Sequence, residues 1–143
     1  MNLSSNWILF ALGSAFFAAL TSLFGKLGVA EINSNLATLI RTVVIFVLIA
    51  TIVSWRDEWQ TPSTIPGRTW LFLILSGAAT GLSWLCFYRA LQIGPISKVA
   101  PIDKLSVAFA IVLGALFLAE KLTWPTIVGG GLIVLGSIVT IAF

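Results

Sequence analysis

Residues 35–53 read NLATLIRTVVIFVLIATIV and contain one charged side chain, Arg41. A helix rises about 1.5 Å per residue, so about 20 residues cover a hydrocarbon core of about 30 Å. Comparable apolar segments occur on both sides of this one, and they occupy residues 7–23, 70–91, 99–118 and 124–143. We therefore predict an all-α, polytopic membrane protein with five transmembrane helices.

The composition leaves little room for anything else. Hydrophobic residues make up 59% of the chain and charged residues 9%, against about 25% charged in soluble domains. The longest interruption, residues 54–69, is a turn-rich loop too small to be a catalytic domain. Residues 1–6 lack the Lys or Arg of a signal peptide, so the first segment is interpreted as a retained helix. The sequence predicts one transmembrane domain over residues 1–143.

Several function classes are disfavoured. Histidine is absent and Cys86 is the only cysteine, so one chain offers neither a Cys/His metal site nor a disulfide. The eight Lys and Arg residues form no basic run of the kind that binds nucleic acid. No nucleophile and base pair or phosphate loop is recognised. We expect no enzyme, no metal, no cofactor and no nucleic-acid partner.

Positive charge is divided almost evenly between the two membrane faces that five crossings imply. The difference in Lys and Arg between the two sides sets the orientation of a membrane protein, and here it is small. We therefore hypothesise that the chain inserts in both orientations, or settles in one of them by a small margin. Arg56, Arg68 and Lys121 lie on the N-terminal side, and Lys26, Arg89, Lys98 and Lys104 on the other, with Arg41 nearest to that second side.

Two segments carry small residues that allow helices to approach closely. Gly77 and Gly81 form a GxxxG pair in residues 70–91, for which packing within the chain is the plain interpretation. In the last segment, glycines 129–131 are followed one heptad later by Gly136 and Ser137. Gly129, Gly130, Gly136 and Ser137 are therefore candidates for a dimer interface, with packing inside the chain as the alternative.

Ionisable residues inside spanning segments are costly and are functional candidates by default. Arg41 lies about 9 Å into its helix, within reach of the interface for an arginine stem, so an anchoring role and a substrate or counter-ion role are both open. In the fourth segment Lys98, Asp103 and Lys104 occupy the first third, beside Ser97 and Pro101. Adjacent helical residues point about 100° apart, so Asp103 and Lys104 are not expected to pair with each other.

Asp103 therefore has two interpretations. One is an interhelical salt bridge with Arg41 or Lys26, and the other is a polar lining of a translocation cavity. Trp84 and Tyr88, near the end of the third segment, are suited either to stacking on a small solute or to packing. Ser14 places a hydroxyl on one face of the first segment, which carries no carboxylate.

Residues 88–107 read YRALQIGPISKVAPIDKLSV, and residues 118–123 read LAEKLT. With Lys26 after the first helix and the glycine-rich last helix, they resemble the EamA family of the drug/metabolite transporter superfamily, especially its short members with one five-helix domain. The resemblance spans essentially the whole chain. It implies one half of a ten-helix fold, in which two five-helix repeats of opposite orientation surround a central cavity.

A single repeat implies that an antiparallel homodimer, or a pair with a homologous chain, makes the complete transporter. It also implies a multi-pass protein of a prokaryotic plasma membrane. We expect a secondary transporter that moves a small polar or amphipathic metabolite by alternating access. The alternative is a non-transporting membrane subunit that stabilises or orients a partner complex.

The residues expected to line or support the pathway share polar or aromatic side chains in the first, third and fourth helices. Lys98 and Lys104 favour an anionic group on the solute, and Asp103 would orient them or carry a proton. The pathway set is Ser14, Trp84, Tyr88, Ser97, Lys98, Asp103 and Lys104, and the structural charges are Lys26, Arg41 and Glu120.

Overall fold

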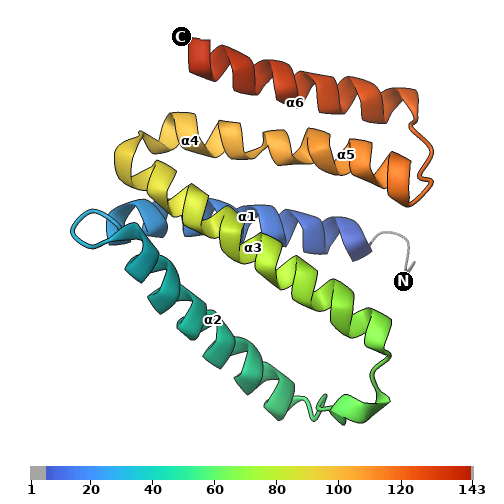
Figure 1. The fold of residues 1–143 in the computed structure, drawn as a ribbon. Helices are drawn as coiled ribbons and strands as arrows, with labels where there is room; N and C mark the ends of the chain where they lie inside the picture. Colours follow the sequence, from blue (N-terminus) through green and yellow to red (C-terminus); the bar gives the residue numbers. More distant parts are fainter. Residues whose placement is uncertain (1–5, 143) are drawn as a thin grey trace. The chain divides into compact units, whose positions relative to one another are not determined.

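The computed structural model describes residues 6–142, and this part of the chain is built from helices without a strand (Figure 1). Residues 1–5 and Phe143, the predicted end of the fifth helix, lie outside the described residues. The elements are α1 (Asn6–Gly28), α2 (Ser34–Trp55), the short 3-10 helix η2 (Pro62–Thr64), α3 (Gly67–Ile93), α4 (Ile96–Asp103), α5 (Leu105–Phe117) and α6 (Trp124–Ala142).

Five helical spans are long and apolar enough to cross a membrane, with α4 and α5 together forming the fourth. Large apolar side chains point outward along them, for example Phe10, Phe46 and Phe117, each more than 70% exposed. Soluble proteins rarely expose apolar surface on this scale, whereas acyl chains cover it in a bilayer. The predicted fold class, an all-α membrane protein with five spanning helices, is confirmed.

The chain divides into two compact units. The first unit comprises residues 24–92, and the second combines residues 93–143 with the segment up to residue 23. α1 and α3 therefore each contribute residues to both units, and each unit is described by itself below.

The first unit is most tightly packed where α1 ends, α2 begins and α3 ends. The buried apolar side chains of the described residues, Val29, Ala37, Tyr88 and Leu91, all belong to this unit. Gln92 Nε2 donates to the carbonyl oxygens of Val29 and Ile32 at 3.2 and 2.8 Å. These bonds satisfy the polar backbone of the α1–α2 loop, which would otherwise be costly to bury.

The start of α2 is fixed by local hydrogen bonds. The side chain of Asn33 caps the helix by accepting from the backbone N–H of Asn35 at 2.8 Å. One turn inside, the hydroxyl of Thr38 donates to the carbonyl of Ser34, and that of Thr42 to Thr38, both below 3.0 Å. Such bonds let hydroxyl groups lie in an apolar span without an external partner.

In the second unit α6 packs along both α4 and α5 (Figure 1). The buried Ser137 Oγ donates to the carbonyl oxygen of Pro101 at 2.8 Å. One heptad earlier, a Cβ added to Gly130 would lie 2.9 Å from Cδ1 of Ile111. Gly130 therefore permits the close approach of α6 to α5 and Ser137 ties α6 to α4.

The fourth span differs from the predicted continuous helix over residues 99–118. It begins earlier, at Ile96, and is interrupted at Lys104, where α4 gives way to α5. Pro101, inside α4, lacks an N–H and cannot donate back to the carbonyl of Ser97. Lys104 N instead donates to Pro101 O at 3.1 Å, and Val107 N to Lys104 O at 3.0 Å, so two tight 3-10 bonds bridge the break.

Candidate functional site

A groove runs between α1 and α4 in the second unit. Its volume is about 460 Å³. α1 provides a floor of small side chains, with Ser14 among them, and Lys104 closes the α4 side. The lining residues are Ala11, Ser14, Ala15, Ala18, Ala19, Ser22, Ile96, Ala100 and Lys104. The structure thus brings together two of the predicted pathway residues, Ser14 and Lys104.

Lys104 is also paired with its neighbour, which corrects the expectation that the two side chains point apart. Lys104 Nζ lies 3.3 Å from Oδ2 of Asp103. The expectation assumed a continuous helix, but α4 ends at Asp103 and Lys104 lies in the break. The backbone at Lys104 stays close to helical, so the long side chain of Lys104 spans the separation between the two neighbours, and the two charges meet. Asp103 therefore forms a salt bridge with Lys104.

This ion pair lies deep in the span. Eight residues of α4 precede the break, which places it about 12 Å from the start of the fourth span. Neither side chain is covered by the chain itself, because the Lys104 side chain is 54% exposed and that of Asp103 37%. Lipid tails cannot solvate such groups, so they require water or another polypeptide beside them.

Ser97 and Lys98 lie on α4 but do not line the groove. Ile96, Ala100 and Lys104 are spaced four residues apart and share one face of the segment, and both predicted residues lie beside that face, exposed. The fourth helix therefore contributes to the groove with fewer of its polar residues than the sequence suggested.

Trp84 and Tyr88 form a second cluster, in the first unit. They lie one turn apart on α3, and the guanidinium of Arg41 on α2 covers both rings. Arg41 Cζ lies 3.5 Å from the centre of the Trp84 ring and 5.2 Å from that of Tyr88. The sequence predicts a structural charge at Arg41 and pathway roles for the two aromatic residues, and the structure joins all three in one cation–π cluster.

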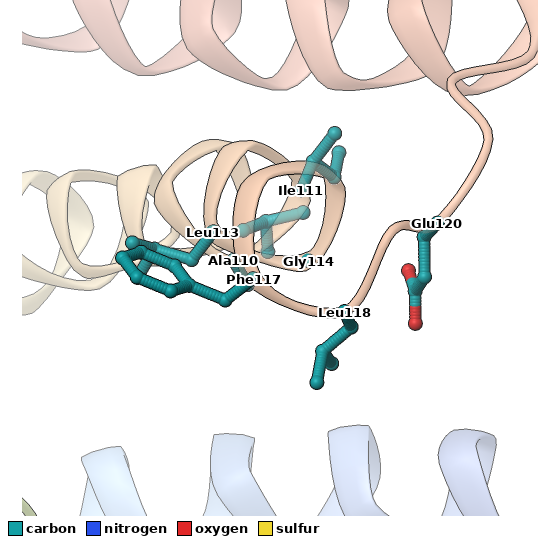
Figure 2. A pocket seen from close by; sticks show the side chains of 8 residues that line it. Ala110, Ile111, Leu113, Gly114, Phe117, Leu118 and Glu120 are labelled. Carbon is teal, nitrogen blue, oxygen red and sulfur yellow. The ribbon is translucent and has the colours of Figure 1, made fainter.

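Of the other two predicted structural charges, Lys26 binds a backbone carbonyl and Glu120 folds over a glycine. Lys26 Nζ donates to the carbonyl oxygen of Leu91 at 2.5 Å, which ties the end of α1 to the end of α3. Glu120 lies on the segment that leaves α5, where it borders an apolar cavity of about 630 Å³ (Figure 2). Its Oε2 would lie 3.0 Å from a Cβ added to Gly114, so the carboxylate is folded over that glycine.

The four candidate interface residues of α6 divide into two pairs. Gly130 and Ser137 face α5 and α4 within the chain, as described above. Gly129 and Gly136 are also seven residues apart, but a Cβ added to either would meet nothing within 4 Å. Only this second pair is available to another chain.

Two features of the site were not predicted. The floor of the groove repeats small residues at positions 11, 15, 18 and 22, a helical spacing that is visible in the sequence once α1 is treated as a packing face. Gln92, which holds the α1–α2 loop, gives no comparable signal, because its partners are backbone carbonyls about 60 positions away.

Residues 5–142 match the EamA-like transporter family. The chain belongs to this family. A relative from Sinorhizobium sp., described as an uncharacterized transporter in the cobO 3′ region, is 54% identical over 141 residues, which are 99% of this chain and all of the relative. The predicted family is therefore confirmed, and membership points to a membrane transporter rather than an enzyme.

A second relative matches about half of the chain. An uncharacterized protein of Methanocaldococcus jannaschii is 36% identical over 67 residues, which are 47% of this chain and 49% of that protein. No solved structure matches the chain.

Proposed function

We propose that this EamA family member moves a small polar or amphipathic metabolite across the plasma membrane by alternating access, as an antiparallel dimer. The observation that carries the proposal is the Asp103–Lys104 ion pair, exposed about 12 Å into the fourth span and bordering the α1–α4 groove. A charge pair in that position needs a polar environment, and a water-filled solute pathway supplies one.

The break at Lys104 supports movement during transport. Broken helices with irregular backbone at membrane depth are a common device of secondary transporters, where they lie at the binding site. α5 contains 13 residues and would span only about 20 Å, so α4 and α5 must act together to cross the bilayer. Lys104 and Asp103 at the joint would contact the solute, with Ser14 on the opposite wall.

A second copy completes the pathway in this proposal. One chain supplies five spans, whereas inverted-repeat transporters place their site between two repeats. The uncovered Gly129 and Gly136 on α6 offer a surface for helix association in a membrane, where small residues allow close backbone contact.

The first test is solute flux in proteoliposomes, with amino acids, sugars and nucleotide-linked compounds as candidate solutes. For a solute that the unaltered protein moves, Asp103→Asn and Lys104→Met are each expected to lower the initial rate by about tenfold or more, because each leaves its partner as an unpaired charge at membrane depth. Lys121→Met is the matched control, since this exposed lysine lies between α5 and α6, away from the groove.

Full activity of both variants would show that the groove is not the pathway. Absence of flux for every candidate solute, together with co-purification of an unrelated membrane protein, would instead favour the alternative function of an auxiliary subunit.

A further inference from the structure

The positive charge of Arg41 has no negative partner within its own unit, residues 24–92. α2 begins at Ser34, so Arg41 lies about 10 Å along the helix from its start. No carboxylate of that unit lies within salt-bridge distance of its guanidinium, and its Nη1 atom is fully buried without a hydrogen-bond acceptor. A guanidinium inside a span normally has a counter-charge or backbone carbonyls around it.

The aromatic rings hold the guanidinium but do not satisfy its donors. Trp84 is stacked against it at 3.5 Å, a distance at which the plane of the group can lie along the ring face. In that arrangement the N–H donors, which lie in the plane of the group, would point past the ring. Tyr88 fixes the other ring contact and is itself buried, 5% exposed. The cluster therefore holds a cation with one buried donor, Nη1, still without an acceptor.

A second arginine in the same unit shows how an exposed guanidinium differs from that of Arg41. Arg68 also covers a ring, that of Phe72 at 5.6 Å, but it is exposed near the start of α3, where water can solvate its charge. Arg41 is half-buried and lies in the interior of its helix. Only Arg41 combines ring stacking with a buried donor that lacks an acceptor.

We propose that Arg41 binds the carboxylate of a small monoanionic ligand, with Trp84 and Tyr88 as the platform that orients the guanidinium. The planar fork of arginine donors matches a carboxylate, which can accept two parallel hydrogen bonds. The neighbouring cations already have polar partners, because Lys26 donates to Leu91 O and Arg89 Nη1 to Gln92 Oε1 at 2.7 Å. One uncommitted positive charge suits one negative charge, so a carboxylate fits better than a phosphate dianion.

This assignment goes beyond the proposed transport function, because Arg41 lies in the first unit whereas the groove proposed as the solute pathway lies in the second. Its test is independent of transport. Full-length protein in lipid nanodiscs is titrated with radiolabelled benzoate by equilibrium dialysis, and acetate, inorganic phosphate and benzylamine serve as competitors. Benzoate is expected to bind, acetate to compete more effectively than phosphate, and benzylamine not to compete.

The variants locate the site. Arg41→Met is expected to weaken benzoate binding by about tenfold to a hundredfold, the range for a lost charge-assisted hydrogen bond. Arg41→Lys keeps the positive charge but loses the planar pair of donors, so its Kd for benzoate should lie between those of the unaltered protein and Arg41→Met. This variant also keeps the test valid if Arg41→Met fails to fold. Arg68→Met, the matched control, should leave the Kd unchanged.

Equal benzoate affinity in the unaltered protein and in both Arg41 variants would overturn the assignment, as would failure of the unaltered protein to bind benzoate or stronger competition by phosphate than by acetate. Flux is measured separately in proteoliposomes. Flux without Arg41-dependent benzoate binding would refute this inference alone, whereas Arg41-dependent binding without flux of any solute would refute transport.

Discussion

Gly25 leaves the space that the phenol of Tyr88 occupies. A Cβ at this position would lie 3.1 Å from Oη and 3.3 Å from Cζ of Tyr88, and 3.4 Å from Cδ1 of Leu91. Both neighbours are buried, and the Tyr88 ring is also held beneath Arg41. The ring therefore has little freedom to retreat, and the aromatic cluster depends on a glycine of another helix.

Gly25→Ala is expected to destabilise the protein by about 1–3 kcal/mol through overpacking. Gly13→Ala, on the same helix, adds a methyl group where nothing lies within 4 Å and should be neutral or stabilising by up to about 1 kcal/mol, as usual for glycine to alanine in a helix. Thermal unfolding of both variants in one detergent measures the difference. Equal unfolding temperatures would contradict the close contact between α1 and α3.

At the scale of the elements, the break between α4 and α5 couples a proline to an ion pair. Pro101 removes one helical hydrogen bond, its own carbonyl accepts from Ser137 Oγ and Lys104 N, and the Asp103–Lys104 pair lies at the turn that follows. A regular helix at this point would be more stable.

Pro101→Ala is therefore expected to raise the unfolding temperature, because an interior proline costs a helix about 3 kcal/mol, and to lower solute flux. Pro95→Ala is the control, since Pro95 precedes α4 as its N-cap and interrupts no helical bond. Thermal unfolding and proteoliposome flux, measured on the same preparations, check the two effects. A variant that is more stable and transports at the full rate would show that the break has no role in movement.

The number of spanning helices and their approximate places could be predicted from apolar length, because a bilayer imposes that length on every span. The interruption at Lys104 could not, although Pro101 was visible, since a proline within a span can kink a helix without ending it. The cluster at Arg41 was also hidden. Its members come from different helices, and sequence spacing relates only Trp84 to Tyr88. The pathway residues as a set stay a prediction.

For the whole molecule, the decisive question is how two copies meet. Gly129→Leu and Gly136→Leu each place a large side chain on the uncovered face of α6, so each is expected to convert a dimer in mild detergent into a monomer. Gly131→Leu is the control, because Gly131 also has open space but points about 200° away from Gly129 on the helix. Light scattering coupled to size-exclusion chromatography reports the mass, and unchanged dimers would assign the interface to another helix.

The orientation of the chain in the membrane is also a property of the whole molecule. The even distribution of Lys and Arg predicts that a reporter active only in the cytoplasm and a reporter active only outside will both work when fused after Phe143. Adding two lysines to one loop should silence one of the two reporters. Activity from a single reporter in the unaltered chain would exclude dual insertion and leave a parallel assembly or an oppositely oriented partner chain.

The stacking of Arg41 on Trp84 also has an optical consequence. The chain contains six tryptophans, and the other five, Trp7, Trp55, Trp59, Trp70 and Trp124, are all exposed, whereas Trp84 is half-buried. A cation against the indole face alters the energy of its excited state. A version that keeps Trp84 and replaces the rest with phenylalanine would carry an intrinsic fluorophore at the proposed binding residue, so its emission could follow ligand arrival in real time without any attached dye.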